Sequence, residues 1–256
     1  MTPAGQIDDD HAVAARVAHQ AGELLVDLIR NPVQDRRWSG LEYEGDRRAH
    51  RFIIDELQRL RPDDVVLSEE GRDDPIRLER DRVWIVDPLD GSSDFGYSPH
   101  WAVHVALVSN GQPVAGAVAV PGWETTWATD PSPSPVARPL DDGSNPRVVV
   151  ARSRSRFDGF RIQQALGAEI FSIGSAGVKA MAVVRGEVDA YVHGGGLYEW
   201  DICAPAAVAA SAGLVCCHAD GSPLSFNKPD VWSPGLIISR PELVDSLVAA
   251  LGLGLR

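Results

Sequence analysis

The chain begins with two stretches in which apolar residues recur three or four positions apart. From Asp8 to Arg30 this spacing predicts an amphipathic helix that ends before Asn31-Pro32. A second stretch, at about Arg47 to Leu60, keeps the same period, and Arg61-Pro62 ends it. The pattern therefore predicts two helices, each with one apolar face that can pack on a core.

Short apolar runs rich in β-branched residues follow the two helices. They predict strands at Asp64 to Ser68, Arg82 to Val86, Trp101 to Val108 and Val114 to Val120. Two helices followed by several strands are typical of an α+β unit.

The second half alternates between the two kinds of element. The predicted strands are Arg147 to Ala151, Glu169 to Ile173 and Val188 to Val192, and the predicted helices are Gly177 to Val184 and Ala204 to Ala212. Between the halves, prolines gather from Asp130 to Pro146, which predicts an interdomain seam. We therefore predict an α+β domain over residues 1–140 and an α/β domain over 146–256, with a cleft between two layered units.

Composition agrees with a globular protein. The 256 residues are 44% apolar and carry a formal net charge of −12, enough apolar material for one or two cores. This acidic balance argues against a partner that is a nucleic-acid polymer, because such binders need a basic face. The N-terminus lacks a signal-peptide pattern and no apolar run is long enough to span a membrane, so we expect no membrane association.

The cysteines indicate a reducing environment. There are three, Cys203, Cys216 and Cys217. An odd number with an adjacent pair fits neither a disulfide framework nor a Cys-x-x-Cys zinc site. We therefore expect a cytoplasmic protein.

The most informative segment is Asp87-Pro88-Leu89-Asp90-Gly91-Ser92, which follows an apolar strand directly. Pro88 favours a turn whose ends, Asp87 and Asp90, lie within roughly 7 Å of each other. Two carboxylates that close would raise each other's pKa unless a cation lies between them. The Leu89 carbonyl can add a neutral oxygen, a ligand set that suits Mg²⁺.

A phosphate fits the end of the same segment. Gly91 and Ser92 present backbone amides at the start of a predicted helical turn, Ser93 to Phe95. Amides at such a terminus attract anions. The segment therefore combines a cation site with a phosphate site.

Further carboxylates could reach the same place. Glu69-Glu70 ends an earlier predicted strand, Asp201 is the predicted N-cap of the helix that follows it, and Asp46 opens the second predicted helix. Each has a plainer interpretation by itself: an Asp-Pro-x-Asp-Gly turn is common, a glutamate pair is usually solvated, and Asp201 and Asp46 could be caps only. Their combination and order carry the functional hypothesis.

This order resembles the lithium-sensitive, magnesium-dependent phosphomonoesterases, which include inositol monophosphatase, fructose-1,6-bisphosphatase and the 3′(2′),5′-bisphosphate nucleotidases. Their pattern is a Glu-Glu pair, then W-I-[IV]-D-P-[IL]-D-G-[ST], then W-D far downstream. The chain is most similar to the bacterial CysQ branch in its actinobacterial form. The stretches that carry this similarity are Leu67 to Glu70, Asp81 to Ile85, Ser172 to Met181, Tyr198 to Asp201 and Asp220 to Leu224.

The resemblance implies a fold and a set of metal ligands. The fold is a layered αβαβα sandwich of the inositol monophosphatase and sugar phosphatase type. Glu69, Asp87 and the Leu89 carbonyl would hold one Mg²⁺, while Asp87, Asp90 and Asp201 would hold a second. Two or three ions are expected in all, together with inhibition by Li⁺.

The resemblance also implies the reaction, hydrolysis of a phosphomonoester by metal-activated water. Ser92, in the position of the usual threonine, would act with Asp46 to orient and deprotonate that water, and Glu69 would take part in catalysis. CysQ enzymes remove the 3′-phosphate of 3′-phosphoadenosine 5′-phosphate. Inositol monophosphate or a sugar phosphate is the alternative substrate, and a non-catalytic binding relative is a second alternative.

Substrate contacts are expected from both halves. Besides Gly91 and Ser92, the candidates are Ser175, Lys179, Gly195 and Gly196. Lys179 is equally compatible with a solvated helix surface, and the glycines with a simple turn. Ser93 stands where nucleotidase relatives often carry a basic residue. Members of the family are often homodimers, so a homodimer is a possible assembly.

Other chemistries are disfavoured. There is no G-x-S-x-G nucleophile elbow and no G-x-x-x-x-G-K-[ST] phosphate loop. His100 and His104 are four apart, as in a helical metal pair, but their surroundings predict a strand, and we assign both to structural roles.

Overall fold

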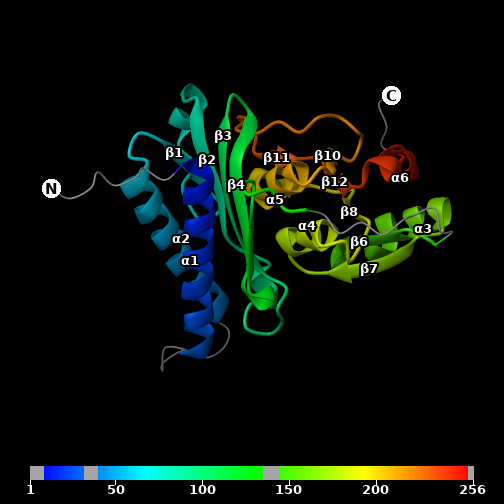
Figure 1. Ribbon diagram of the computed structural model, residues 1–256, viewed down its shortest axis with the longest axis horizontal. Helices are drawn as coiled ribbons and strands as arrows, with labels where there is room; N and C mark the ends of the chain where they lie inside the picture. Colours follow the sequence, from blue (N-terminus) through cyan, green and yellow to red (C-terminus); the bar gives the residue numbers. More distant parts are fainter. Residues whose placement is uncertain (1–8, 32–39, 135–143, 253–256) are drawn as a thin grey trace.

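A computed structural model describes residues 9–31, 40–134 and 144–252 (Figure 1). Across the molecule, helices and sheets alternate in five layers: two helices, a sheet, two helices, a second sheet and two outer helices. The predicted αβαβα architecture is thus confirmed. Among the described residues, no helix combines the length and the apolar character needed to cross a membrane.

The first layer is formed by α1 (Asp10–Arg30) and α2 (Leu41–Leu60). Helix α1 follows its predicted range, and Asp9 caps it by accepting a hydrogen bond from the Ala12 amide at 2.7 Å. Residue 8, where the prediction began, lies outside the described part of the chain.

Helix α2 begins earlier than predicted, at Leu41 rather than Arg47. Gly45 and Asp46 therefore lie inside the helix, and the prediction that they open it was wrong. The reason is packing: a Cβ on Gly45 would lie 2.9 Å from the Phe95 ring. Glycine, a poor helix former, is required there by this close approach.

The first sheet contains five strands in sequential order. They are β1 (Val65–Ser68), β2 (Arg82–Asp90), β3 (Ala102–Ser109), β4 (Gln112–Val120) and β5 (Thr125–Ala128). Strand β1 runs parallel to β2, and the other neighbours are antiparallel. The four predicted strands are confirmed, with β2 extended through the aspartate motif, whereas the short β5 was not predicted.

This sheet is buried on both faces. On β2, Trp84 and Val86 pack in the cluster formed with α1 and α2, while Val83 and Ile85 pack in the central cluster with the next helices. Burial on both sides explains why β2 is a continuous apolar run rather than an alternating one.

The second sheet has the order β10-β12-β8-β6-β7. Its strands are β6 (Arg147–Ala151), β7 (Glu169–Ile173), β8 (Ala190–His193), β10 (Val215–Cys217) and β12 (Leu236–Ser239), and β9 (Leu197–Tyr198) pairs separately with β11 (Trp232–Ser233). Strands β6 and β7 match their predicted ranges, and β8 is shifted slightly. The sequence analysis missed β9 to β12, which are only two to four residues long.

Four helices cover this sheet. Helices α4 (Ala176–Val184) and α5 (Glu199–Ser211) lie between the sheets, and α3 (Phe160–Leu166) and α6 (Val244–Leu251) cover the outer face. Helix α4 is buried along its whole length. The two outer helices, which are short, were not predicted.

The central core joins the two predicted domains. Strand β2, helix α4 and strand β8 all contribute to one buried cluster. Part of the predicted seam, residues 135–143, lies outside the described residues. The division into 1–140 and 146–256 stays a prediction, and the two parts share a core.

Truncation of a buried side chain on α2 should destabilise the layer that carries Asp46. Ile53 is completely buried, and Ile53→Ala should lower the free energy of unfolding by about 2 to 5 kcal/mol, since such truncations leave cavities. Urea denaturation measures this change. Gln58→Ala, an exposed site on the same helix, is the control, and equal effects of the two substitutions would contradict the described packing.

Candidate active site

Strands β1 and β2 bring the first carboxylates together. Because the two strands are parallel, their carboxyl-terminal ends lie at one edge, and the Glu69 amide donates to the Val86 carbonyl at 3.3 Å. Asp87 is 1% exposed and its Oδ1 accepts from the Leu89 amide at 3.0 Å. The predicted turn from Asp87 to Asp90 was wrong: β2 continues to Asp90, with a shift in its register against β3 between these two residues. Glu69 lies close enough to Asp87 for its charge to raise the pKa of that carboxyl group.

Helix α5 supplies a third segment. One carboxylate oxygen from each of Asp87, Asp90 and Asp201 lies within 4.8 Å of the others. The sequence predicted Asp201 as the N-cap of α5, and this was wrong, because the helix starts at Glu199. Asp201 Oδ2 accepts from the Tyr198 amide at 2.6 Å. It lies in the first helical turn and still reaches the cluster.

These carboxyl groups raise one another's pKa. Burial and the charges of Glu69, Asp90 and Asp201 raise the pKa of Asp87 well above its ordinary value. Burial and the Asp90 charge raise the pKa of Asp201 to about 7. A divalent cation would relieve this repulsion, and the donors are the hard oxygens that Mg²⁺ prefers. The cluster therefore fits a metal ion.

Asp90 is the anchored member of the cluster. It accepts from Ser175 Oγ at 2.5 Å, from the Ala176 amide at 3.0 Å and from the Gly177 amide at 2.7 Å. Burial would raise the pKa of Asp90, but His104, the charge of Lys179 and the Ser175 hydroxyl hold it below its ordinary value. Asp90 therefore keeps its negative charge at the N-terminal end of α4.

His104 is a contact that sequence reasoning did not find. It lies on β3 opposite Asp87 in the strand pairing, and its Nε2 is 3.2 Å from Asp90 Oδ2. Burial lowers and Asp90 raises the pKa of His104, with a net upward shift. The available signal was a single histidine in an otherwise apolar strand next to the aspartate motif.

The other predicted catalytic residues lie at the edge of the cluster. Asp46 is half-buried, and burial with the charges of Glu70 and Glu69 raises its pKa to about 8. Ser92 begins a 3₁₀ turn, Ser92–Asp94, that packs against α2. Both residues are described, and no hydrogen bond joins them, so the Asp46–Ser92 pair stays a prediction.

Gly91 leads into this turn with a left-handed backbone, φ 85°. A Cβ there would lie 2.8 Å from the His100 carbonyl oxygen and 3.0 Å from Ser175 Cβ. Glycine is therefore required where β2 turns toward α4.

A positive charge reaches the same turn from the second half of the chain. Arg152 Nη1 donates to both carboxylate oxygens of the buried Asp94, at 3.0 and 2.8 Å. The two residues meet beside Gly174, where a Cβ would lie 3.4 Å from Arg152 Nη1. Ser93 itself is uncharged, and the positive charge beside it comes from Arg152, which is distant in the sequence.

Lys179 lies inside the protein rather than on a solvated helix face, so that alternative was wrong. It is 3% exposed, its Nζ donates to the Ser175 carbonyl, and it lies 5.1 Å from the centre of the Tyr191 ring. Burial lowers the pKa of Lys179 to about 8, although Asp90 and Asp201 oppose that shift.

The glycine run after β8 has structural contacts. A Cβ on Gly196 would lie 2.2 Å from the Trp232 indole nitrogen, and the Gly195 amide donates to His193 Nδ1 at 3.4 Å. Glu199 is completely buried and accepts from the amides of Asn227 and Lys228. The predicted substrate roles of Gly195 and Gly196 stay predictions.

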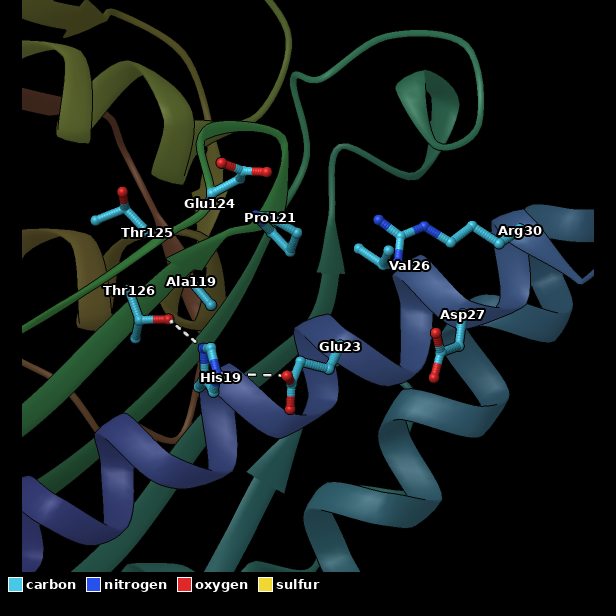
Figure 2. Close-up of a pocket in the computed structure, with 10 residues that line it drawn as sticks. All are labelled: His19, Glu23, Val26, Asp27, Arg30, Ala119, Pro121, Glu124, Thr125 and Thr126. Carbon is cyan, nitrogen blue, oxygen red and sulfur yellow. Dashed lines mark hydrogen bonds and ion pairs between the residues drawn. The ribbon is translucent and has the colours of Figure 1, made fainter.

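A separate pocket of about 430 Å³ opens between α1 and the segment where β4 ends and β5 begins (Figure 2). In it, His19 contacts Thr126 at 3.2 Å and Glu23 at 3.7 Å. None of the predicted site residues lines this pocket. The pocket therefore shares no residue with the carboxylate cluster.

Comparison with known proteins gives concordant results. A model of the Inositol monophosphatase family matches residues 8–251. A protein of Mycobacterium bovis named 3′-phosphoadenosine 5′-phosphate phosphatase is 44% identical over 239 residues, which is 90% of this chain and 89% of the relative. A Thermotoga maritima protein named fructose-1,6-bisphosphatase/inositol-1-monophosphatase is 31% identical over 82% of this chain and 84% of its own length. The crystal structure of CysQ from Bacteroides thetaiotaomicron superposes with a TM-score of 0.75 at 27% identity, covering 90% of this chain and 97% of that one.

The raised carboxyl pKa values make metal-free protein sensitive to alkali. With ordinary values of 3.8 and folded values of about 7 for Asp201 and about 8 for Asp46, the folded state binds more protons in this interval. Stability therefore falls as pH rises through it. We expect the Tm of EDTA-treated protein to drop by several degrees between about pH 5 and about pH 8.5.

The depressed pKa of Asp90 does not act in this interval, because its contribution is lost only as the pH falls below 3.8. Asp201→Asn and Asp46→Asn should each flatten the slope, and Asp55→Asn, an exposed site on α2, should leave it unchanged. A Tm that rises over the interval would contradict the electrostatics of the cluster.

Proposed function

Because the chain belongs to the inositol monophosphatase family, we propose that it is a Mg²⁺-dependent phosphomonoesterase that removes the 3′-phosphate of 3′-phosphoadenosine 5′-phosphate. The observation that carries the proposal is the convergence of Asp87, Asp90 and Asp201 from two distant segments to within 4.8 Å. The name of the mycobacterial relative supports the choice of substrate.

Two sets of oxygens would hold the metal. Glu69, Asp87 and the Leu89 carbonyl form one, and Asp87, Asp90 and Asp201 form the other. Bound Mg²⁺ would polarise the phosphoryl group and lower the pKa of water. Li⁺ is expected to inhibit by competing for these carboxylates.

The remaining chemistry falls to the chain's own residues. The backbone amides of Gly91 and Ser92 would orient the phosphate, as donors at the start of a helical turn do. Asp46 would accept the proton of the attacking water through Ser92 Oγ, as a carboxylate general base does.

Recognition of the rest of the substrate would come from the second half. Ser175 lies beside Gly91 and would line the leaving-group side with Gly195 and Gly196. Lys179 would not touch the substrate but would position Ser175, because its Nζ donates to the Ser175 carbonyl. Arg152, 51% exposed and held by Asp94, offers a cation for the second phosphate of a bisphosphate.

An inositol monophosphate or sugar phosphate is the second candidate substrate, favoured by the similarity to the Thermotoga protein. A non-catalytic relative is disfavoured, because every proposed metal ligand is present. The free thiols of Cys203, Cys216 and Cys217 are consistent with the cytoplasmic location that we propose. A homodimer stays a prediction.

Asp90→Asn should reduce phosphate release from 3′-phosphoadenosine 5′-phosphate by about a hundredfold or more. Both Asp90 oxygens accept from backbone amides of α4. In the variant, the side-chain NH₂ group would face one of these donors, which is unfavourable. The substitution also removes the negative charge that a metal ion needs. Phosphate release is measured with and without Mg²⁺.

Asp245→Asn makes the same change at an exposed position on α6 and serves as the control. Comparison of kcat/KM on adenosine bisphosphate, inositol 1-phosphate and fructose 1,6-bisphosphate identifies the substrate class. Activity that needs no Mg²⁺ and survives Asp90→Asn would end the proposal.

Arg152→Ala should raise KM for the adenosine bisphosphate by about tenfold, the value of a lost charge-assisted hydrogen bond, with a smaller effect on inositol 1-phosphate. Arg152→Lys should retain part of the affinity, and Arg59→Ala, which removes an exposed arginine paired with Glu56, should change neither constant. Equal losses on both substrates would assign Arg152 to folding of the turn rather than to the second phosphate.

A further inference from the structure

His104 connects two segments that each carry a proposed metal ligand. Its Nδ1 lies 3.1 Å from the Trp200 carbonyl oxygen, directly before Asp201, and its Nε2 lies 3.2 Å from Asp90 Oδ2. The side chain is completely buried. One imidazole thus spans from the end of β2 to the first turn of α5.

The hydrogen-bond partners determine the orientation of this ring. A carbonyl oxygen only accepts, so Nδ1 must carry the hydrogen that it shares with Trp200. Nε2 then lies 3.2 Å from Asp90 Oδ2 and forms an ion pair with that carboxylate when the ring is protonated. Each ring nitrogen therefore faces one acceptor, and the two acceptors fix the ring in the core.

The ring has no room to move away. A Cβ on Gly177 would lie 2.2 Å from His104 Nε2, so the glycine allows the ring to lie directly against the start of α4. The same glycine donates its amide to Asp90 at 2.7 Å. His104 and α4 therefore hold Asp90 from two sides.

We propose that His104 is a positioning residue that sets the distance between Asp90 and Asp201 and thereby the affinity for the metal ion. The inference rests on the proposed function in that these two carboxylates are taken as ligands. Groups that orient metal ligands typically change metal affinity by ten- to a hundredfold when removed. A purely structural histidine would change only stability.

Two variants separate the two contacts. In His104→Asn the amide reaches about as far as Nδ1 and can still bond to the Trp200 carbonyl, but it cannot reach Asp90. In His104→Gln the amide reaches about as far as Nε2, and the contact with Trp200 is lost. Because the proposal needs both contacts, each variant should bind Mg²⁺ about tenfold more weakly than the wild type.

Isothermal titration of Mg²⁺ into the EDTA-stripped full-length protein gives this Kd. The matched control is His218→Asn, a buried histidine whose Nδ1 contacts the Gly235 carbonyl at 3.2 Å and which contacts none of Asp87, Asp90 and Asp201 in the described structure. It should lower Tm without changing the Kd. Activity of both His104 variants should recover at saturating Mg²⁺, which a folding defect would not allow.

The outcomes are distinguishable from failure of the proposed function. If the wild type binds Mg²⁺ and Asp90→Asn does not, the metal site stands. Wild-type Mg²⁺ affinity in either His104 variant would then overturn the positioning role alone. If neither wild type nor Asp90→Asn shows specific Mg²⁺ binding, the proposed function and this inference both fail.

Discussion

Electrostatic repulsion among Asp87, Asp90 and Asp201 is the interaction around which the site is organised. Like charges in a weakly polarisable interior repel strongly, and proton uptake relieves that repulsion unless a cation does. The three respond differently: His104, Lys179 and Ser175 lower the pKa of Asp90, so it stays charged, whereas the pKa values of Asp87 and Asp201 rise. Binding of a metal ion there must therefore release protons.

The layered fold makes this concentration of charge tolerable. Helices α4 and α5 are held between two sheets, and the N-terminal end of each faces the carboxylates: α4 through its amides to Asp90, and α5 through the first-turn Asp201. Helix N-termini carry partial positive charge, so both arrangements offset part of the repulsion. The buried side chains of β2 pack against α4 and α5 and thereby fix the distance between these helices and the aspartate motif.

Local patterns explain how much the sequence could predict. The strand before Asp87, the helical turn that follows Gly91 and the period of α1 are each encoded by consecutive residues, and they were predicted correctly to within one or two residues. The starts of α2 and α5 were not, because they depend on contacts between distant residues, such as Gly45 against Phe95 and Glu199 against the amide of Asn227. His104 needed the strand register as well, and Arg152 needed the packing of the two halves.

Several contacts that the sequence analysis did not find connect the two predicted domains. Asp90 with Ser175, His104 with Trp200, and Asp94 with Arg152 each join the first half of the chain to the second. The proposed metal ligand Asp90 is thus oriented by bonds that cross the predicted seam rather than by either half alone. Both parts of the chain also contribute to the central core. The donors around Asp90 are therefore held by the same packing that joins the two halves.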